Sequence, residues 1–358
     1  MFKIIIRGSV LNSIIICKTL SIQGILTLSS LTSNDIPKRW SNYELGASYI
    51  PTLSIKKELS NTNFLDFESA YYLKRDYTGD SLYNNLNKIH RLWLRYATKK
   101  LETRLGLQKI IFGPTQILRP LSWFDTFDLK DPTGQTNGVE AFRLKWFPSN
   151  DMSLWMWLIQ NTTDTVSYGL RTELASSIGE FGITYHLEPT NTKQNIGSID
   201  FPINSPHSRF ALDYRFDGFI GFWNESVIIK SEKSQILLSS LGFDYTIPVS
   251  NGIIIMAEAM YSSNNYENLN INENYYSVIM ASMPIGIMHM VTYISQFEFS
   301  EEKNYHYFRW SSTFDSYSLN IIFSLNPKRN QYKIPTNLLP KTLLGFGTGI
   351  QFMFIYNH

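Results

Sequence analysis

The C-terminal stretch Gly345–Tyr356 reads GFGTGIQFMFIY and has a period of two over its whole length. Its bulky set is Phe346, Thr348, Ile350, Phe352, Phe354 and Tyr356, which alternates with Gly345, Gly347, Gly349, Gln351, Met353 and Ile355. This period is that of a β-strand, whose successive side chains point to opposite faces of the sheet. The stretch contains no charged residue, although exposed edge strands are usually protected by charge. We therefore expect it to be the closing strand of a sheet, with an ordinary edge strand as the alternative.

The same alternation continues through the chain from about residue 43. It is clearest in Phe64–Lys74, Leu101–Gln108, Thr165–Leu174 and Arg209–Phe216, where apolar residues oppose charged and small ones. These segments are about ten residues long, the length a strand needs to cross a bilayer when tilted by about 45°. The polar faces carry both signs of charge, as a water-filled lumen would. The residues expected to face that lumen are Arg171, Glu173, Arg209, Asp213 and Arg215.

The composition favours a membrane barrel over a soluble β-sandwich, which is the main alternative fold. Charged residues make up 17% of the chain, below the roughly 25% of soluble domains. Aromatic residues make up 15%, while the mean hydropathy is only −0.15. Strands that are apolar outside and polar inside, with aromatic girdles, explain both values. The net charge of +2 gives no reason to expect nucleic-acid binding.

The N-terminal region is interpreted separately from the barrel. Lys3 and Arg7 precede two apolar stretches, Val10–Cys17 and Leu20–Leu31, which is typical of a signal peptide. We expect residues 1–33 to be a signal peptide or an N-terminal extension, and residues 34–358 to form one barrel domain. Cys17 is the one cysteine of the chain, so no disulfide and no cysteine metal site is expected in the barrel.

Turn signals predict a meander of antiparallel strands. Asn251-Gly252, Pro148–Asp151 and Asp217-Gly218 separate strand-like segments, and Asn-Gly is a strong hairpin signal. Longer polar stretches are expected to be surface loops: Glu188–His207, Ser262–Asn274 and Asn326–Leu339. The predicted fold is an all-β, antiparallel, up-and-down transmembrane β-barrel of about 16 strands, with 14 and 18 left open because bacterial barrels close with even numbers.

A second distinctive segment, Arg104–Pro148, begins RLGLQKIIFGPTQILRPLSWFDTFDLKDPTG. Its features are an R-x-G-x-Q strand (Arg104, Gly106, Gln108), a loop with aromatic residues and Asp131-Pro132, and a strand that opens at Gly138. This resembles a segment of porin-like bacterial outer-membrane β-barrel proteins, including alginate-export-type barrels. The resemblance implies a passive channel for small hydrophilic solutes in the bacterial outer membrane, without a cofactor.

The C-terminal strand also resembles the signal that barrel-insertion machinery recognises. The matching residues are Phe352, Phe354 and Tyr356, but Asn357 and His358 follow the last aromatic residue. The partners expected from these resemblances are outer-membrane lipid and lipopolysaccharide, the insertion machinery and small hydrophilic solutes. Homo-oligomerisation is left open.

The connection 113–136 is long for a hairpin loop, and loops of that size are usually functional. If its aromatic residues anchor it inside the barrel, its charges would narrow the pore and filter ions. The residues of this expected constriction are Arg104, Arg119, Asp125, Asp128, Lys130, Asp131, Arg143 and Lys145. The alternative is a surface loop that its aromatic residues hold down.

The sequence offers little for catalysis. None of the six histidines lies in a G-x-S-x-G motif, and no pair of them has metal-ligand spacing. The nearest candidate is His306 with Ser311 and Ser312, which a girdle histidine explains more simply. We therefore predict no catalytic residues and no metal site. The alternatives are a barrel enzyme that hydrolyses lipid or peptide, and a barrel with a structural or assembly role.

Overall fold

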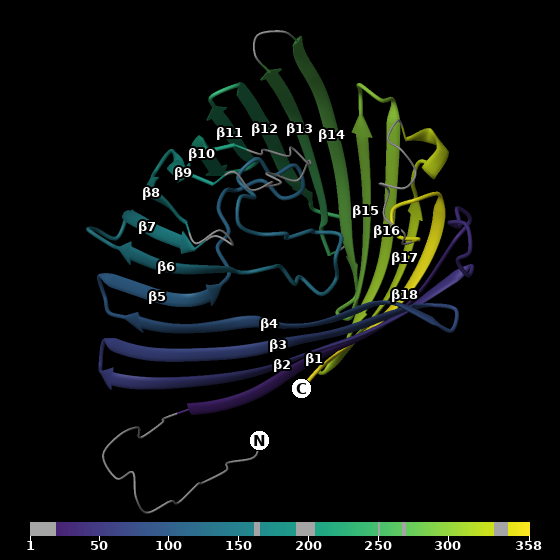
Figure 1. Cartoon of the computed structure of the whole chain (residues 1–358), viewed down its shortest axis with the longest axis horizontal. Helices are drawn as coiled ribbons and strands as arrows, with labels where there is room; N and C mark the ends of the chain where they lie inside the picture. The colour runs from purple at the N-terminus through teal and green to yellow at the C-terminus, as the bar shows by residue number, and fades with distance from the viewer. Residues whose placement is uncertain (1–18, 161–164, 191–204, 250, 267–269, 333–342) are drawn as a thin grey trace, which may run out of the picture.

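The computed structural model describes residues 19–160, 165–190, 205–249, 251–266, 270–332 and 343–358 (Figure 1). These residues form eighteen strands and one short 3-10 helix, Arg329–Gln331. The strands are β1 (Thr19–Ser33), β2 (Tyr43–Ser60), β3 (Asn63–Thr78), β4 (Ser81–Ala97), β5 (Leu101–Gln108), β6 (Val139–Trp146), β7 (Met152–Gln160), β8 (Val166–Ser176), β9 (Gly179–Glu188), β10 (His207–Asp217), β11 (Gly221–Ser231), β12 (Ser234–Ile247), β13 (Ile253–Tyr266), β14 (Asn270–Ile285), β15 (His289–Glu298), β16 (Lys303–Thr313), β17 (Tyr317–Leu325) and β18 (Thr348–Asn357). Among the described residues, no helix is long and apolar enough to span a membrane.

The strands form one closed antiparallel ring. Each strand pairs with its sequence neighbours, and β1 pairs with both β2 and β18. The all-β antiparallel barrel and the closing role of the C-terminal strand are therefore confirmed. The prediction of about 16 strands was wrong, since the described residues contain 18.

The expected boundary at residue 33 does not match the structure, because Thr19–Ser33 is strand β1 of the barrel. The apolar stretch Leu20–Leu31 has the period of two of a strand, which the interpretation as a hydrophobic leader region does not explain. Leu20 and Ile22 are exposed on the outer face, at 47% and 63%, and polar residues such as Gln23 and Thr27 alternate with this set. Within the described residues, the barrel thus includes Thr19–Ser33. Residues 1–18, including Cys17, lie outside the described residues, so the signal peptide stays an expectation.

The two faces of the wall differ as the alternation predicts. On β8 and β10, Leu170 and Phe210 are 50% and 42% exposed on the outside, whereas Arg171 and Arg209 are buried in the interior. Only the inner face of each strand is buried in the barrel. This fixes the strand register, because a slip by one residue would exchange the inner and outer faces.

All the long connections between strands lie at one end of the ring. Following the chain up and down, 34–42, 109–138, 189–206 and 326–347 all fall at one end, here called the long-loop end. Turns such as 98–100, 177–178 and 218–220 fall at the other, the short-turn end. The predicted loop Ser262–Asn274 was wrong, because β13 and β14 extend through most of it and pair as far as Tyr266 and Asn270. Its polar residues continue the strand alternation.

Candidate functional site

The chain turns into the barrel directly after β5. Gly106 has φ +113°, and a side chain there would collide with the Leu92 carbonyl of the neighbouring strand, so the glycine of the R-x-G-x-Q pattern is required by its backbone. The fully buried Gln108 side chain donates to the Ala141 carbonyl at 2.9 Å. These two residues fix the point where 109–138, here called the lumen loop, leaves the wall.

The lumen loop lies within the ring of strands in Figure 1. Its outgoing part reaches inward-facing carboxylates on β11 and β13, Glu225 and Glu258. The Lys130 carbonyl then accepts a 2.6 Å hydrogen bond from the Tyr307 hydroxyl of β16. On the return, Arg91 of β4 donates to the Thr136 carbonyl at 2.6 Å. The lumen loop therefore crosses the interior and is held at several points of the wall.

Aromatic side chains attach one side of the lumen loop to the β6–β12 wall. Phe112 packs 5.1 Å from Trp157 of β7, and Phe124 lies 5.1 Å from the ring of His186 of β9. Trp123 is buried in the same cluster, with Ile229 and Ile236 of the wall. Packed side chains therefore hold this part of the lumen loop against the β6–β12 wall.

Two predicted filter residues, Arg119 and Asp125, form an ion pair inside the lumen loop. Their atoms Nη1 and Oδ1 are 2.6 Å apart, and both side chains are almost completely buried. Asp125 also accepts from the Phe127 amide at 2.9 Å. The structure thus gives this pair a role in holding the fold of the lumen loop.

We expect Arg119→Ala to destabilise the folded lumen loop by about 3–5 kcal/mol, because it leaves the Asp125 carboxylate buried without its partner. Hydrogen exchange of the peptide that contains Ser122–Phe127, measured by mass spectrometry, should become much faster. The double variant Arg119→Met/Asp125→Leu should recover most of the protection, since neither charge is then buried alone. Equal protection in the wild type and Arg119→Ala would contradict this role.

The tip of the lumen loop presents the remaining predicted charges. Asp128 is exposed and Asp131 and Lys130 are half-buried. The two carboxylates accept main-chain hydrogen bonds of 2.9 Å, from the Lys130 and Thr133 amides respectively. In the described part of the chain, neither Asp128 nor Asp131 forms an ion pair with a basic residue of the wall.

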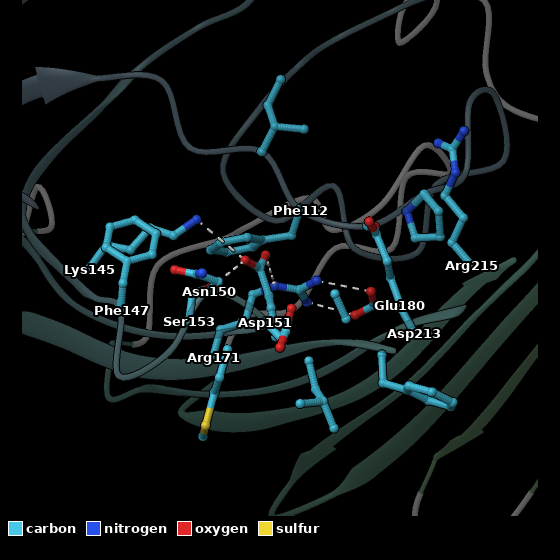
Figure 2. A pocket seen from close by; sticks show the side chains of 18 residues that line it. Phe112, Lys145, Phe147, Asn150, Asp151, Ser153, Arg171, Glu180, Asp213 and Arg215 are labelled. Atoms are coloured by element: carbon cyan, nitrogen blue, oxygen red, sulfur yellow. Dashed lines mark hydrogen bonds and ion pairs between the residues drawn. The ribbon is translucent and has the colours of Figure 1, made fainter. Parts of the chain in front are cut away.

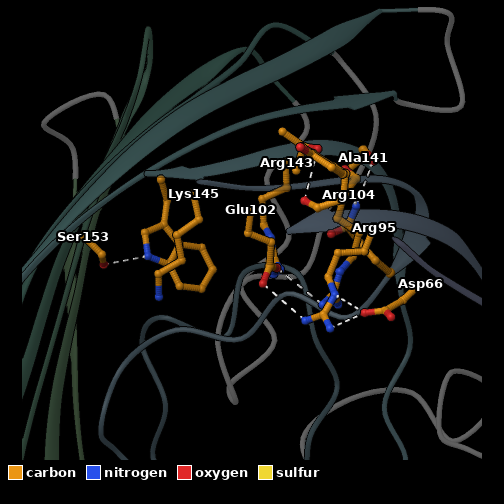
Figure 3. A network of polar contacts seen from close by, with 12 residues as sticks. Asp66, Arg95, Glu102, Arg104, Ala141, Arg143, Lys145 and Ser153 are labelled. Carbon is orange, nitrogen blue, oxygen red and sulfur yellow. Dashed lines mark hydrogen bonds and ion pairs between the residues drawn. The ribbon is translucent and has the colours of Figure 1, made fainter. Parts of the chain in front are cut away.

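The basic residues of β4–β6 form a network near the short-turn end (Figure 3). Arg95, Arg104 and Arg143 lie directly opposite one another on three successive strands. Glu102 accepts from Arg143 at 2.6 Å and lies 3.4 and 3.5 Å from the other two guanidinium groups. Asp66 also pairs with Arg95. Three guanidinium groups thus share two carboxylates, which leaves one positive charge in excess.

Tryptophan rings lie close to the basic side chains of this network. The Arg104 guanidinium lies 4.4 Å from the ring centre of Trp93, and that of Arg143 lies 5.0 Å from Trp155. Lys145 Nζ is 4.0 Å from the same Trp155 ring. The attraction between cation and ring holds these long side chains close to the wall.

The network continues into a cavity of about 450 Å³ between the lumen loop and β6–β10 (Figure 2). Arg171 donates to both carboxylate oxygens of Asp213, at 2.6 and 2.9 Å, and to Glu173 at 2.9 Å. Lys145 Nζ also lies 3.4 Å from Glu173. Arg215 pairs with Asp217 at 3.0 Å, and Arg209 is buried 5.6 Å from the ring centre of Trp123.

The structure therefore separates the predicted constriction residues into three groups: a buried pair, an acidic tip and a basic wall. Sequence reasoning missed the partners that connect them, namely Asp66, Arg95, Glu102, Glu225 and Glu258. Each lies on the polar face of a strand, so the alternation could have identified them as inward-facing. It could not have shown which other strands they meet.

The structure contains only part of the side-chain arrangement that a hydrolytic enzyme would need. His306 lies on the outer face and contacts the Tyr293 hydroxyl at 2.9 Å, not a serine. His289 Nδ1 lies 2.8 Å from Ser312 Oγ. Among the described residues no carboxylate hydrogen-bonds to His289, so the acid that would orient a catalytic histidine is missing there. The described residues contain no group of three or more His, Cys, Asp or Glu side chains that could hold a metal ion.

Comparison with known proteins supports the fold. No protein-family model matches the sequence, and no curated protein does so. Pseudomonas aeruginosa OccD3 (OpdP) superposes with a TM-score of 0.59 at 7% identity, over 95% of this chain and 91% of that one. For OccK5 (OpdH) of the same organism the TM-score is 0.58 at 7% identity, over 95% and 98% of the chains. For Salmonella typhi OmpF in complex with daunomycin it is 0.53 at 10% identity, over 95% and 97%. The chain is thus similar in fold to these proteins along almost its full length.

Proposed function

We propose that this protein is a porin-type channel of the bacterial outer membrane, through which small hydrophilic solutes diffuse passively. The observation that carries the proposal is a closed barrel with a charged interior, crossed by a loop that packs against one side of it. A wall whose outer face is apolar fits a bilayer, and a polar lumen fits a water-filled path. The fold likeness to OccD3, OccK5 and OmpF supports the same conclusion.

Several finer proposals go with this function. The R-x-G-x-Q segment favours kinship with alginate-export-type barrels. Outer-membrane lipid, lipopolysaccharide and the barrel-insertion machinery are the expected partners, and homo-oligomerisation is compatible with the apolar outer wall. We propose no enzymatic activity, because the His289–Ser312 contact lacks an orienting acid among the described residues.

The proposed constriction has charges of opposite sign in separate places. The acidic carboxylates belong to the tip of the lumen loop, and the excess positive charge belongs to the β4–β6 wall. Charges in a narrow, poorly screened space act on passing ions more strongly than surface charges do. Each group should therefore shift ion preference in its own direction, and weak overall selectivity would follow from their opposition.

Neutralising the two groups separately should shift the reversal potential in opposite directions. We expect Asp128→Asn/Asp131→Asn to move the preference toward anions, and Arg104→Gln/Arg143→Gln to move it toward cations. The measurement is the reversal potential of single channels in a planar bilayer under a salt gradient. Glu140→Gln, on the outer face of β6, is the matched control and should leave the potential unchanged.

The same recordings test the proposed function itself. Purified, folded protein should insert and give discrete conductance steps at the level expected of a water-filled pore. A folded barrel that produces no conductance steps would refute the channel. If the protein conducts but neither pair of substitutions shifts the reversal potential, the channel function would stand and the selectivity filter would have to lie elsewhere.

A further inference from the structure

Two acidic side chains project from the wall into the part of the interior that the lumen loop fills. Glu225 of β11 is 0% exposed and Glu258 of β13 is 2% exposed. A carboxylate that is removed from water is very costly unless it is paired or hydrogen-bonded. Within the described part of the chain, neither forms an ion pair with Lys or Arg. Their compensation has to come from another kind of group.

That group is the main chain of the lumen loop. Glu225 accepts the Thr115 amide on Oε1 at 2.9 Å and the Leu121 amide on Oε2 at 3.0 Å. Between these two contacts, residues 116–118 donate three successive amides to Glu258, at 2.7, 3.0 and 2.7 Å. The Trp223 indole N–H adds a sixth donor, at 3.2 Å from Glu258 Oε1.

Such successive N–H groups form a concave anion site of the kind that proteins use for phosphate and other anions. Here the anion is supplied by the wall and the concave backbone by the lumen loop. Hydrogen bonds to a charged acceptor are roughly twice as strong as those between neutral groups. The contact is therefore both stronger and more specific in position than packing alone.

Gly113, just before these amide donors, has the backbone conformation and the small size that the contact requires. Gly113 has φ +81°, a conformation that side-chain-bearing residues rarely adopt. A Cβ at this position would overlap the Glu225 carboxylate. Gly113 is thus the residue that lets the backbone approach the carboxylate closely enough for the Thr115 amide to bind it.

We propose that Glu225 and Glu258 are the positioning residues of the channel: their carboxylates bind the amides of residues 115–121 and so fix the lumen loop across the pore. The proposal rests on the proposed function and names the groups that set its constriction. The proposal requires carboxylates, whose two oxygens both accept hydrogen bonds. A glutamine of the same size replaces one of these oxygens with an NH₂ group, which cannot accept from a backbone N–H.

The test compares Glu225→Gln, Glu258→Gln and the double variant with wild type. Trypsin cleavage of the folded barrel at Lys130 reports the position of the lumen loop, and open-channel current noise reports its motion. We expect the double variant to be cleaved at least about tenfold faster, because it loses charge-assisted hydrogen bonds that hold the lumen loop, and to show greater open-channel noise. Glu44→Gln, which changes a buried carboxylate on β2 that accepts the Leu343 amide, should behave as wild type.

Gly113→Ala provides an independent route, because it separates backbone and carboxylate while leaving both acids in place. It should also accelerate cleavage, and it keeps the test valid if the double variant does not fold. Wild-type cleavage and noise in the folded glutamine variants, or in Gly113→Ala, would overturn the proposal. The cleavage assay needs no channel activity. A wild-type protein without conductance would therefore refute the proposed function, while the cleavage rates of the variants would still test the positioning role.

Discussion

Replacing residues 109–138 by a two-residue Asn-Gly turn should raise single-channel conductance by about twofold or more, because conductance follows the narrowest cross-section of a water-filled path. The shortening is geometrically feasible, since Gln108 and Val139 are already paired at the ends of β5 and β6. An Asn-Gly turn suits the twist of such a hairpin. The measurement is single-channel current in a planar bilayer.

The barrel should survive this deletion. Its walls are held by the hydrogen-bond ladder of the closed ring, to which the lumen loop contributes no strand. Heat-modifiable migration and the β-sheet circular dichroism signal should therefore match those of wild type. Glu225 and Glu258 would become hydrated, which removes their need for the loop amides. Unchanged conductance in a folded deletion variant would show that the lumen loop does not limit the pore.

Local patterns predicted most of the wall because a strand with one face in lipid and one in the lumen must alternate. The predicted segment Leu101–Gln108 is β5 without any change of bounds. The same rule failed for β1, where a run of apolar residues near positive charges looked like a leader region. Polar residues such as Ser21 and Gln23 alternate with the apolar ones, as they do in a strand. A leader region is recognised by its apolar content and charge, so its pattern does not exclude such alternation.

The candidate site was less predictable because it is made by contacts between distant segments. The length and aromatic content of 113–136 pointed to an unusual loop, yet its charges do not all act alike. Arg119 and Asp125 neutralise each other within the lumen loop, a pairing that no spacing rule indicates. Glu258 meets residues 116–118 across about 140 positions of sequence. Only the closed ring brings these segments together.

The C-terminal strand should be the place where loss of two aromatic residues harms assembly most. Phe354 lies opposite Leu28 of β1 and Leu319 of β17, and Tyr356 lies opposite Leu26 and Tyr317 on the same two strands. These side chains belong to the outer face, where Phe352 is 55% exposed. Phe354→Ala/Tyr356→Ala therefore weakens both seams of the strand that closes the ring.

We expect most of this double variant to remain unassembled, as measured by the heat-modifiable fraction in outer-membrane preparations. The matched control is Phe181→Ala/Phe243→Ala, which removes two outer-face aromatic residues from β9 and β12. Its apolar loss is similar, but its strands do not close the ring, so it should assemble nearly as wild type does. If both variants lost assembly equally, outer-face hydrophobicity would explain the effect without a terminal signal. Full assembly of Phe354→Ala/Tyr356→Ala would show that the closing strand is held by its backbone ladder alone, because the ladder is all that the two substitutions leave unchanged at that seam.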